Sequence, residues 1–229
     1  MMSDLERTTL QYNGRIDTDW NLVTGCTRTE KKCRRCRSQI LKSRLGGTTC
    51  PARRYGIGVQ LHSERLYQPL SWLEPRTVFV CPQSDLTLPG VPAALIKDAF
   101  RIMRRTPQHR FQVLTMHPTK LALLSTELSW AENIHVGATF ETLDHADRVE
   151  ILRDVPAARR FLYVDSLRCP VEELDLRGID SLVVGLEGGA LQRADAERVL
   201  EIVNLCSDAS VQISFRRWGA QSRRHRRSA

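Results

Sequence analysis

The chain has 229 residues, a formal net charge of +8 and seven cysteines. This length suits one α/β domain with a substantial core. The sequence has no apolar run long enough to span a bilayer and no signal peptide, so we expect a cytoplasmic protein that does not bind a membrane. The cysteines are odd in number and, outside one cluster, widely scattered, which argues for a reducing cytosol and against a disulfide framework.

The positive charge is concentrated in two segments. Residues 28–54 carry ten lysines and arginines and one glutamate, and residues 216–227 carry six arginines, which leaves a net charge of −7 on the rest. Two basic zones on an acidic body are typical of a protein that binds a polyanion such as nucleic acid. For the C-terminal segment, a solvated tail without a partner is an equally good interpretation.

Hydrophobic patterning after a polar lead-in at 1–14 predicts alternating strands and helices. We expect seven or eight strands, at residues 15–23, 57–62, 77–81, 111–115, 134–140, 160–165, 181–187 and 211–215. Helices are expected at residues 35–44, 93–104, 118–128, 145–153, 171–174 and 194–206.

This alternation predicts parallel strands joined by helical crossovers. So many units favour a TIM-like (β/α) barrel, complete or partial, with the helices outside, and an open doubly wound sheet is the alternative. The first predicted strand is not followed by a phosphate-binding glycine motif, which argues against a dinucleotide-binding fold. We therefore expect one barrel domain at residues 15–219, with a cysteine loop at 25–37 and a basic tail at 220–229.

Three cysteines lie close together in the predicted loop. Cys26 and Cys33 are separated by six residues, and Cys33 and Cys36 by two. Thiolates are soft ligands that suit zinc or iron–sulfur clusters, and three of them leave one position of a four-site centre open. The basic residues around them favour the thiolate form that metals bind.

Other interpretations of the three cysteines stay open at this point. A zinc site could be completed by a distant Cys50, Cys81 or His62. The thiols could also be free, or two of them could form a reversible disulfide in a redox sensor. The spacing alone fits iron and zinc equally well.

Polar residues follow several of the predicted strands. Because the carboxyl ends of parallel strands converge on one face of a barrel, these residues predict a ligand-binding face that also carries the cysteine loop. Each one alone is also typical of helix capping or of a loop hydrogen bond. The residues are Ser84, Asp85, Thr115, His117, Glu141, Asp165, Glu187, Gly188 and Gly189.

Taken together, these segments resemble the phage-borne, three-cysteine, radical-SAM-like barrel family, most of whose members are phage proteins of unknown function. The resemblance covers nearly the whole chain in order. It runs through residues 17–26, 59–66, 75–80, 84–86, 109–115, 133–137, 156–162, 185–189 and 217–219.

The resemblance implies a 4Fe–4S cluster on Cys26, Cys33 and Cys36, with S-adenosylmethionine on the remaining iron. In that chemistry the reduced cluster cleaves the sulfonium, and a 5′-deoxyadenosyl radical abstracts a substrate hydrogen. It also implies an electron donor such as a flavodoxin or ferredoxin, in the cytoplasm of a bacterium or a phage-infected bacterium. The residues predicted to bind the cofactor are Ser84, Asp85, Glu141, Asp165, Glu187 and Gly188.

By resemblance, the substrate is a nucleobase, nucleotide or nucleic acid. The residues predicted to bind it are Arg34, Arg35, Arg37, Arg223 and Arg224. The alternative is a metal-stabilised nucleic-acid-binding protein, with zinc or an iron–sulfur centre and no catalysis.

The chain departs from the family pattern near the cysteines and at three strand ends. Lys32 stands where the family usually has glycine, and Arg37-Ser38 stands where it has Tyr-Ala. The other departures are at Cys81-Pro82-Gln83, Met116-His117 and Asp165. The cysteines themselves match, so cluster binding is the property that the resemblance implies most directly.

Overall fold

The computed structural model describes residues 16–25, 59–186 and 193–217. Seven parallel strands form the main sheet, in the order β1-β4-β5-β6-β7-β8-β9. They are β1 (Thr18–Trp20), β4 (Thr77–Val80), β5 (Arg110–Thr115), β6 (Ile134–Phe140), β7 (Arg159–Val164), β8 (Ser181–Leu186) and β9 (Gln212–Arg217). The helices are α4 (Ala93–Arg105), α5 (Pro118–Leu123), α6 (Ala146–Asp154) and α7 (Arg193–Asp208). Two short strands, β2 (Val23–Thr24) and β3 (Gln60–Leu61), pair antiparallel as a separate sheet.

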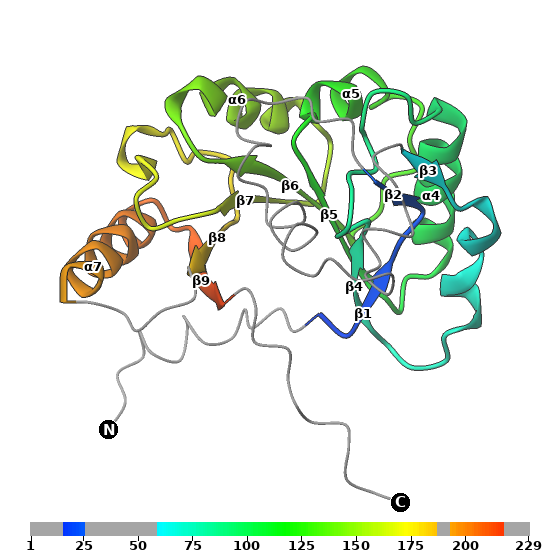
Figure 1. Ribbon diagram of the computed structural model, residues 1–229, viewed down its shortest axis with the longest axis horizontal. Helices are drawn as coiled ribbons and strands as arrows, with labels where there is room; N and C mark the ends of the chain where they lie inside the picture. Colours follow the sequence, from blue (N-terminus) through cyan, green and yellow to red (C-terminus); the bar gives the residue numbers. More distant parts are fainter. Residues whose placement is uncertain (1–15, 26–58, 187–192, 218–229) are drawn as a thin grey trace, which may run out of the picture.

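The main sheet is singly wound and, over the described residues, open. Its strands follow one another across the sheet in the same order as along the chain. The two edge strands are β1 and β9. Figure 1 shows the helices arranged in an arc along one side of the sheet. This arrangement confirms the predicted parallel α/β sheet and excludes a doubly wound one, in which the strand order reverses and helices cover both faces. The described strands do not establish a closed barrel.

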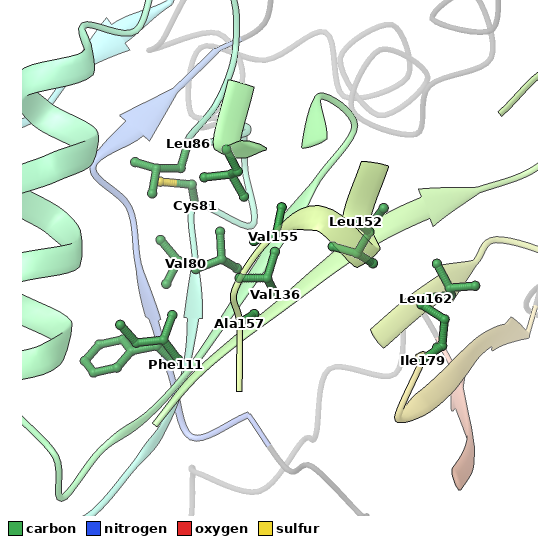
Figure 2. Packing of buried hydrophobic residues seen from close by; sticks show 14 of the residues in the cluster. Val80, Cys81, Leu86, Phe111, Val136, Leu152, Val155, Ala157, Leu162 and Ile179 are labelled. Atoms are coloured by element: carbon green, nitrogen blue, oxygen red, sulfur yellow. The ribbon is translucent and has the colours of Figure 1, made fainter. Parts of the chain in front are cut away.

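One face of the sheet forms the main core with the helices. Four apolar side chains lie side by side in register on neighbouring strands, and each is at most 1% exposed. They are Trp20, Val80, Val113 and Val136. Figure 2 shows strand residues of this core near Leu152 of α6 and the residues that follow that helix. Burial of such apolar surface is the main favourable term in folding.

The opposite face is more polar and carries its own small cluster. Side chains alternate along a strand, so the next row in register, from Asp19 and Phe79 through Gln112 and His135 to Arg159, faces away from the helices. Further along the strands, Phe161, Tyr163 and Val183 form a separate apolar cluster with Leu114. We call this side the inner face.

Gly137 makes room for an aromatic ring on the inner face. A Cβ atom at this position would lie 2.3 Å from the ring of Phe161 in the neighbouring strand. Glycine is therefore needed where the ring of Phe161 crosses β6. This packing places the apolar cluster against the backbone in the middle of the sheet.

Most elements lie within a few residues of their predicted positions, but three predictions need correction. The predicted strand at 15–23 is two strands, because β2 leaves the main sheet to pair with β3. For the same reason, the predicted strand at 57–62 is not part of the parallel sheet. The predicted helix at 118–128 ends at Leu123, and turns such as Leu128 N to Leu124 O continue from there.

Several predictions fall on residues that the structure does not describe. They are the lead-in at 1–14, the cysteine loop from Cys26 onward, the helix at 35–44 and the tail at 220–229. Within the described ranges, none of the helices combines the length and the apolar character needed to cross a bilayer.

His135 gives the fold a specific pH dependence. The residue is 4% exposed, and burial lowers the pKa of its ring to about 4, with Arg110 and Arg159 adding to the effect and Asp180 opposing it. In the unfolded chain the ring titrates at about 6.5. Between these two values the unfolded state binds more protons, so stability falls as the pH drops from about 6.5 to about 4.

We expect a His135→Gln variant to lose this dependence because glutamine does not titrate. Between pH 7 and pH 4.5, its free energy of unfolding should fall by about 2 kcal/mol less than that of the wild type. Urea denaturation at the two pH values measures the difference. Equal losses in the two proteins would contradict a neutral, buried His135.

Candidate cofactor site at the carboxyl edge of the sheet

The chain reaches the carboxyl edge of the sheet at Gly25, immediately before the three-cysteine segment. Gly25 has a φ of 84°, which glycine adopts without steric cost. Its carbonyl oxygen accepts a hydrogen bond from Ser84 Oγ at 2.6 Å. Cys81 N also donates to Trp20 O at 2.9 Å, so the ends of β1 and β4 stay joined. The backbone that leads into Cys26 is therefore fixed to the loop after β4.

A chain of polar contacts runs from the surface to a buried hydroxyl near the same point. Oγ1 of Thr24 lies 2.8 Å from Nε2 of His62, and Nδ1 of His62 lies 3.1 Å from Oε1 of Glu64. Thr24 is 1% exposed, whereas the Glu64 side chain is 65% exposed. Both ring nitrogens of His62 are thus engaged, which disfavours this residue as the fourth ligand of a zinc site.

Cys81 also fits poorly as that fourth ligand. It is 1% exposed, and burial raises the pKa of its thiol to about 12. A thiol must lose its proton to bind a metal. Across the described ranges, no group of three His, Cys, Asp or Glu side chains could hold a metal ion. The remaining predicted ligands, all outside the described residues, are Cys26, Cys33, Cys36 and Cys50.

Asp85 joins the loops that follow β4 and β5. It is 3% exposed. Its Oδ1 accepts hydrogen bonds from Thr87 N at 2.8 Å and from Thr87 Oγ1 at 2.9 Å. Its Oδ2 accepts from Thr115 Oγ1 at 2.9 Å and from Met116 N at 2.8 Å. The carboxylate therefore holds two strand-end loops together, and a direct contact with a cofactor stays a prediction.

His117 extends this hydrogen-bond network through its backbone, whereas one nitrogen of its ring has no hydrogen-bond partner among the described residues. Its backbone N donates to Thr115 Oγ1 at 2.7 Å, and its carbonyl oxygen lies 3.3 Å from Thr87 Oγ1, whose single proton is donated to Asp85. Its ring atom Nε2 is buried and has no hydrogen-bond partner among the described residues. A buried polar atom of this kind is costly unless something binds it. His117 thus presents an unsatisfied nitrogen near the predicted site.

Two carboxylates share one neighbour at the ends of β6 and β7. Glu141 and Asp165 follow Phe140 and Val164, the last residues that pair between these strands. The pKa of the Cys169 thiol is raised mainly by burial, and the charges of Glu141 and Asp165 raise it further. Glu141 is half-buried and Asp165 is exposed. The charges of both acidic groups therefore act on the same thiol.

The structure describes four of the predicted residues, and their binding roles stay predictions. Ser84, Asp85, Glu141 and Asp165 all follow strands at the carboxyl edge of one sheet. The predicted residues outside the described ranges are Glu187, Gly188, Arg34, Arg35, Arg37, Arg223 and Arg224.

The hydrogen-bond partners of these residues were not predicted from the sequence. The Asp85-Leu86-Thr87 pattern is typical of a side chain that caps its own turn and could have indicated the structural role of Asp85. No sequence signal links Thr24 with His62, because their contact depends on antiparallel pairing across the cysteine segment.

Several solved structures are similar to this chain. A double mutant of spore photoproduct lyase with bound AdoMet and dinucleoside spore photoproduct has a TM-score of 0.50 at 13% identity, covering 88% of this chain and 69% of that one. A single-site mutant of the same lyase has a TM-score of 0.47 at 14% identity, covering 79% of this chain. The chain spans 59% of the length of that second structure. At such low identity, the likeness concerns the fold alone.

A search of curated proteins found no match to the sequence. One protein family, DUF5131, described as a protein of unknown function, matches residues 8–229. This range includes the three cysteines, the whole described sheet and the basic tail. Because the match covers nearly the entire chain, the protein belongs to the DUF5131 family.

Proposed function

We propose that this protein is an iron–sulfur enzyme of the radical S-adenosylmethionine type. The observation that carries the proposal is the hydrogen bond from Ser84 to Gly25, because it ties the start of the cysteine segment to the carboxyl edge of a parallel sheet. Ligands of parallel α/β folds bind at this edge. Cys26, Cys33 and Cys36 would hold a 4Fe–4S cluster, and S-adenosylmethionine would bind the remaining iron.

Polar groups at the described edge support a bound cofactor with hydroxyl and charged groups. The buried Nε2 of His117 lacks a partner among the described residues, and a ligand could supply one. Glu141 and Asp165 could accept hydrogen bonds from ribose hydroxyls or pair with the ammonium group of S-adenosylmethionine. When bound, the cluster and S-adenosylmethionine supply a carbon-centred radical that removes a hydrogen atom from the substrate.

The chain's own residues would fix the cysteine segment and keep water away. Ser84 holds the backbone at Gly25, and Asp85 holds the neighbouring loops together. On the inner face, Phe161 and Tyr163 form part of an apolar cluster in the middle of the sheet. Exclusion of water protects a reactive intermediate from side reactions.

The basic segments support a nucleobase, nucleotide or nucleic acid as the substrate. Residues 28–54 have a net charge of +9, include Cys33 and Cys36 and begin two residues after Cys26, so a polyanion would be attracted to the cysteine segment itself. Arginines also bind phosphate groups with two parallel hydrogen bonds. Arg34, Arg35 and Arg37 would therefore bind the phosphates of the substrate.

Anaerobic reconstitution tests the proposal. Protein treated with iron and sulfide and then desalted should contain about four iron and four sulfide per chain. After reduction with dithionite, it should convert S-adenosylmethionine to 5′-deoxyadenosine, measured by liquid chromatography. Protein heated before reduction is the control.

A colourless protein that retains one zinc and forms no 5′-deoxyadenosine would contradict the proposal. Salt-dependent binding of DNA or RNA without cleavage of S-adenosylmethionine would instead support a metal-stabilised nucleic-acid-binding protein.

A further inference from the structure

A polar pocket opens at the end of the sheet opposite the candidate cofactor site. It has a volume of about 730 Å³ and is formed by the amino ends of β5, β6, β7 and β9 and the loops that precede them. This volume is within the range of small-molecule sites. None of the residues predicted for cofactor binding lines it.

Two arginines flank a histidine in this pocket. Arg159 pairs in register with His135, and Arg110 lies two residues before Gln112, which pairs with His135 on its other side. All three of Arg110, His135 and Arg159 therefore project from the inner face, and all three line the pocket. Both guanidinium groups lower the pKa of His135, so their charges act on the same space.

The positive charge of the pocket is only partly balanced. Arg110 is exposed and makes no ion pair within the described part of the chain. Arg159 forms a long ion pair, in which its Nη1 lies 3.9 Å from Oδ1 of Asp180. Asp180 is also occupied by the backbone N of Arg160, which donates to it at 2.8 Å. Glu132 at the pocket is the other acidic group. An anion could therefore bind between the two arginines.

Uncharged hydrogen-bonding groups complete the lining. Gln108 and Gln212 line the pocket. Such groups suit the polar parts of a ligand that is larger than a single anion.

We infer that this pocket binds a phosphate-bearing ligand of nucleotide size between Arg110 and Arg159. The strands β5 and β7 are separated by β6, so their backbones lie roughly 10 Å apart, and two arginine side chains can converge on one phosphate or bind two successive ones. The phosphate could belong to a free nucleotide or to a nucleic acid backbone. This inference does not depend on the proposed radical chemistry.

Calorimetric titration of the full-length protein tests the inference, with ADP, pyrophosphate and a short single-stranded DNA as probes. The double variant Arg110→Ala/Arg159→Ala should bind whichever of these probes the wild type binds at least about tenfold more weakly. The control is Arg104→Ala, an exposed arginine of α4 that does not line the pocket, which should stay within about twofold.

The probes distinguish the two sources of phosphate. Loss of ADP and pyrophosphate binding in the double variant supports a free nucleotide, and loss confined to DNA supports a nucleic acid backbone. Equal affinities in the double variant and the control overturn the inference. Glu132→Gln provides an independent check, because removing this acid should tighten binding about twofold to fivefold. Unchanged or weaker binding in that variant also counts against the site.

Discussion

Replacing Cys26, Cys33 or Cys36 with alanine should remove the iron of the reconstituted protein and lower 5′-deoxyadenosine formation by about 1,000-fold or more, to background. The reason is that two thiolates hold a four-iron cluster too weakly to survive desalting. Iron content, absorbance of the cluster and chromatography of the product measure the effect. Each single substitution should have nearly the full effect, because the three ligands act as one unit.

Cys50→Ala is the matched control for these variants. It removes a thiol from the same basic stretch without touching the three-cysteine motif, so iron and activity should stay close to the wild type. If Cys50→Ala lost its metal together with the other three variants, the centre would have four protein thiolates, as a structural zinc site does. That outcome would leave no open position for S-adenosylmethionine.

Asp85→Ala should lower the free energy of unfolding by about 3 to 5 kcal/mol. The substitution removes the acceptor of two backbone N–H groups, those of Thr87 and Met116, and of the hydroxyls of Thr87 and Thr115. Each buried donor left without a partner costs about 1 to 3 kcal/mol. Urea denaturation followed by circular dichroism measures the loss.

Two further variants make this prediction specific. Asp85→Asn keeps the shape of the side chain but replaces one oxygen by an NH₂ group, which then faces two other hydrogen-bond donors. This variant should also have a lower free energy of unfolding, by about 2 kcal/mol or more. Asp98→Ala removes a carboxylate from the surface of α4, where it pairs with Arg101, and should cost at most about 0.5 kcal/mol. A loss below about 1 kcal/mol for Asp85→Ala would show that the carboxylate does not hold the loops.

The parallel sheet could be predicted because its strands carry their own signal. Residues 134–140 and 160–164 are rich in β-branched and aromatic side chains, each run is followed by an acidic residue, and they correspond to β6 and β7. The amphipathic pattern of α4 is equally clear, with Ile96, Ala99 and Met103 buried. The antiparallel pairing of the short β2 and β3 could not be predicted, since two-residue strands have no periodicity to detect.

The candidate site was only partly predictable for a different reason. The prediction used the rule that polar residues after parallel strands lie at one edge of the sheet, and Ser84, Glu141 and Asp165 do follow such strands. That rule does not tell a residue that faces a ligand from one that holds the protein together. Asp85 follows the same rule, yet both of its oxygens accept hydrogen bonds from neighbouring loops. The polar pocket at the amino ends depends on register between strands, which residue patterns do not contain.

The order of the strands also has a consequence for how the chain folds. From β4 to β9, paired residues in neighbouring strands differ in number by 20 to 33, so this part of the sheet can be assembled one βα unit at a time. The pairing of β1 with β4 spans 60 residues, and the cysteine segment lies inside that loop. Closing the longer loop costs more chain entropy. The docking of β1, and with it the positioning of Gly25 before the cysteines, is therefore expected to be a late step of folding.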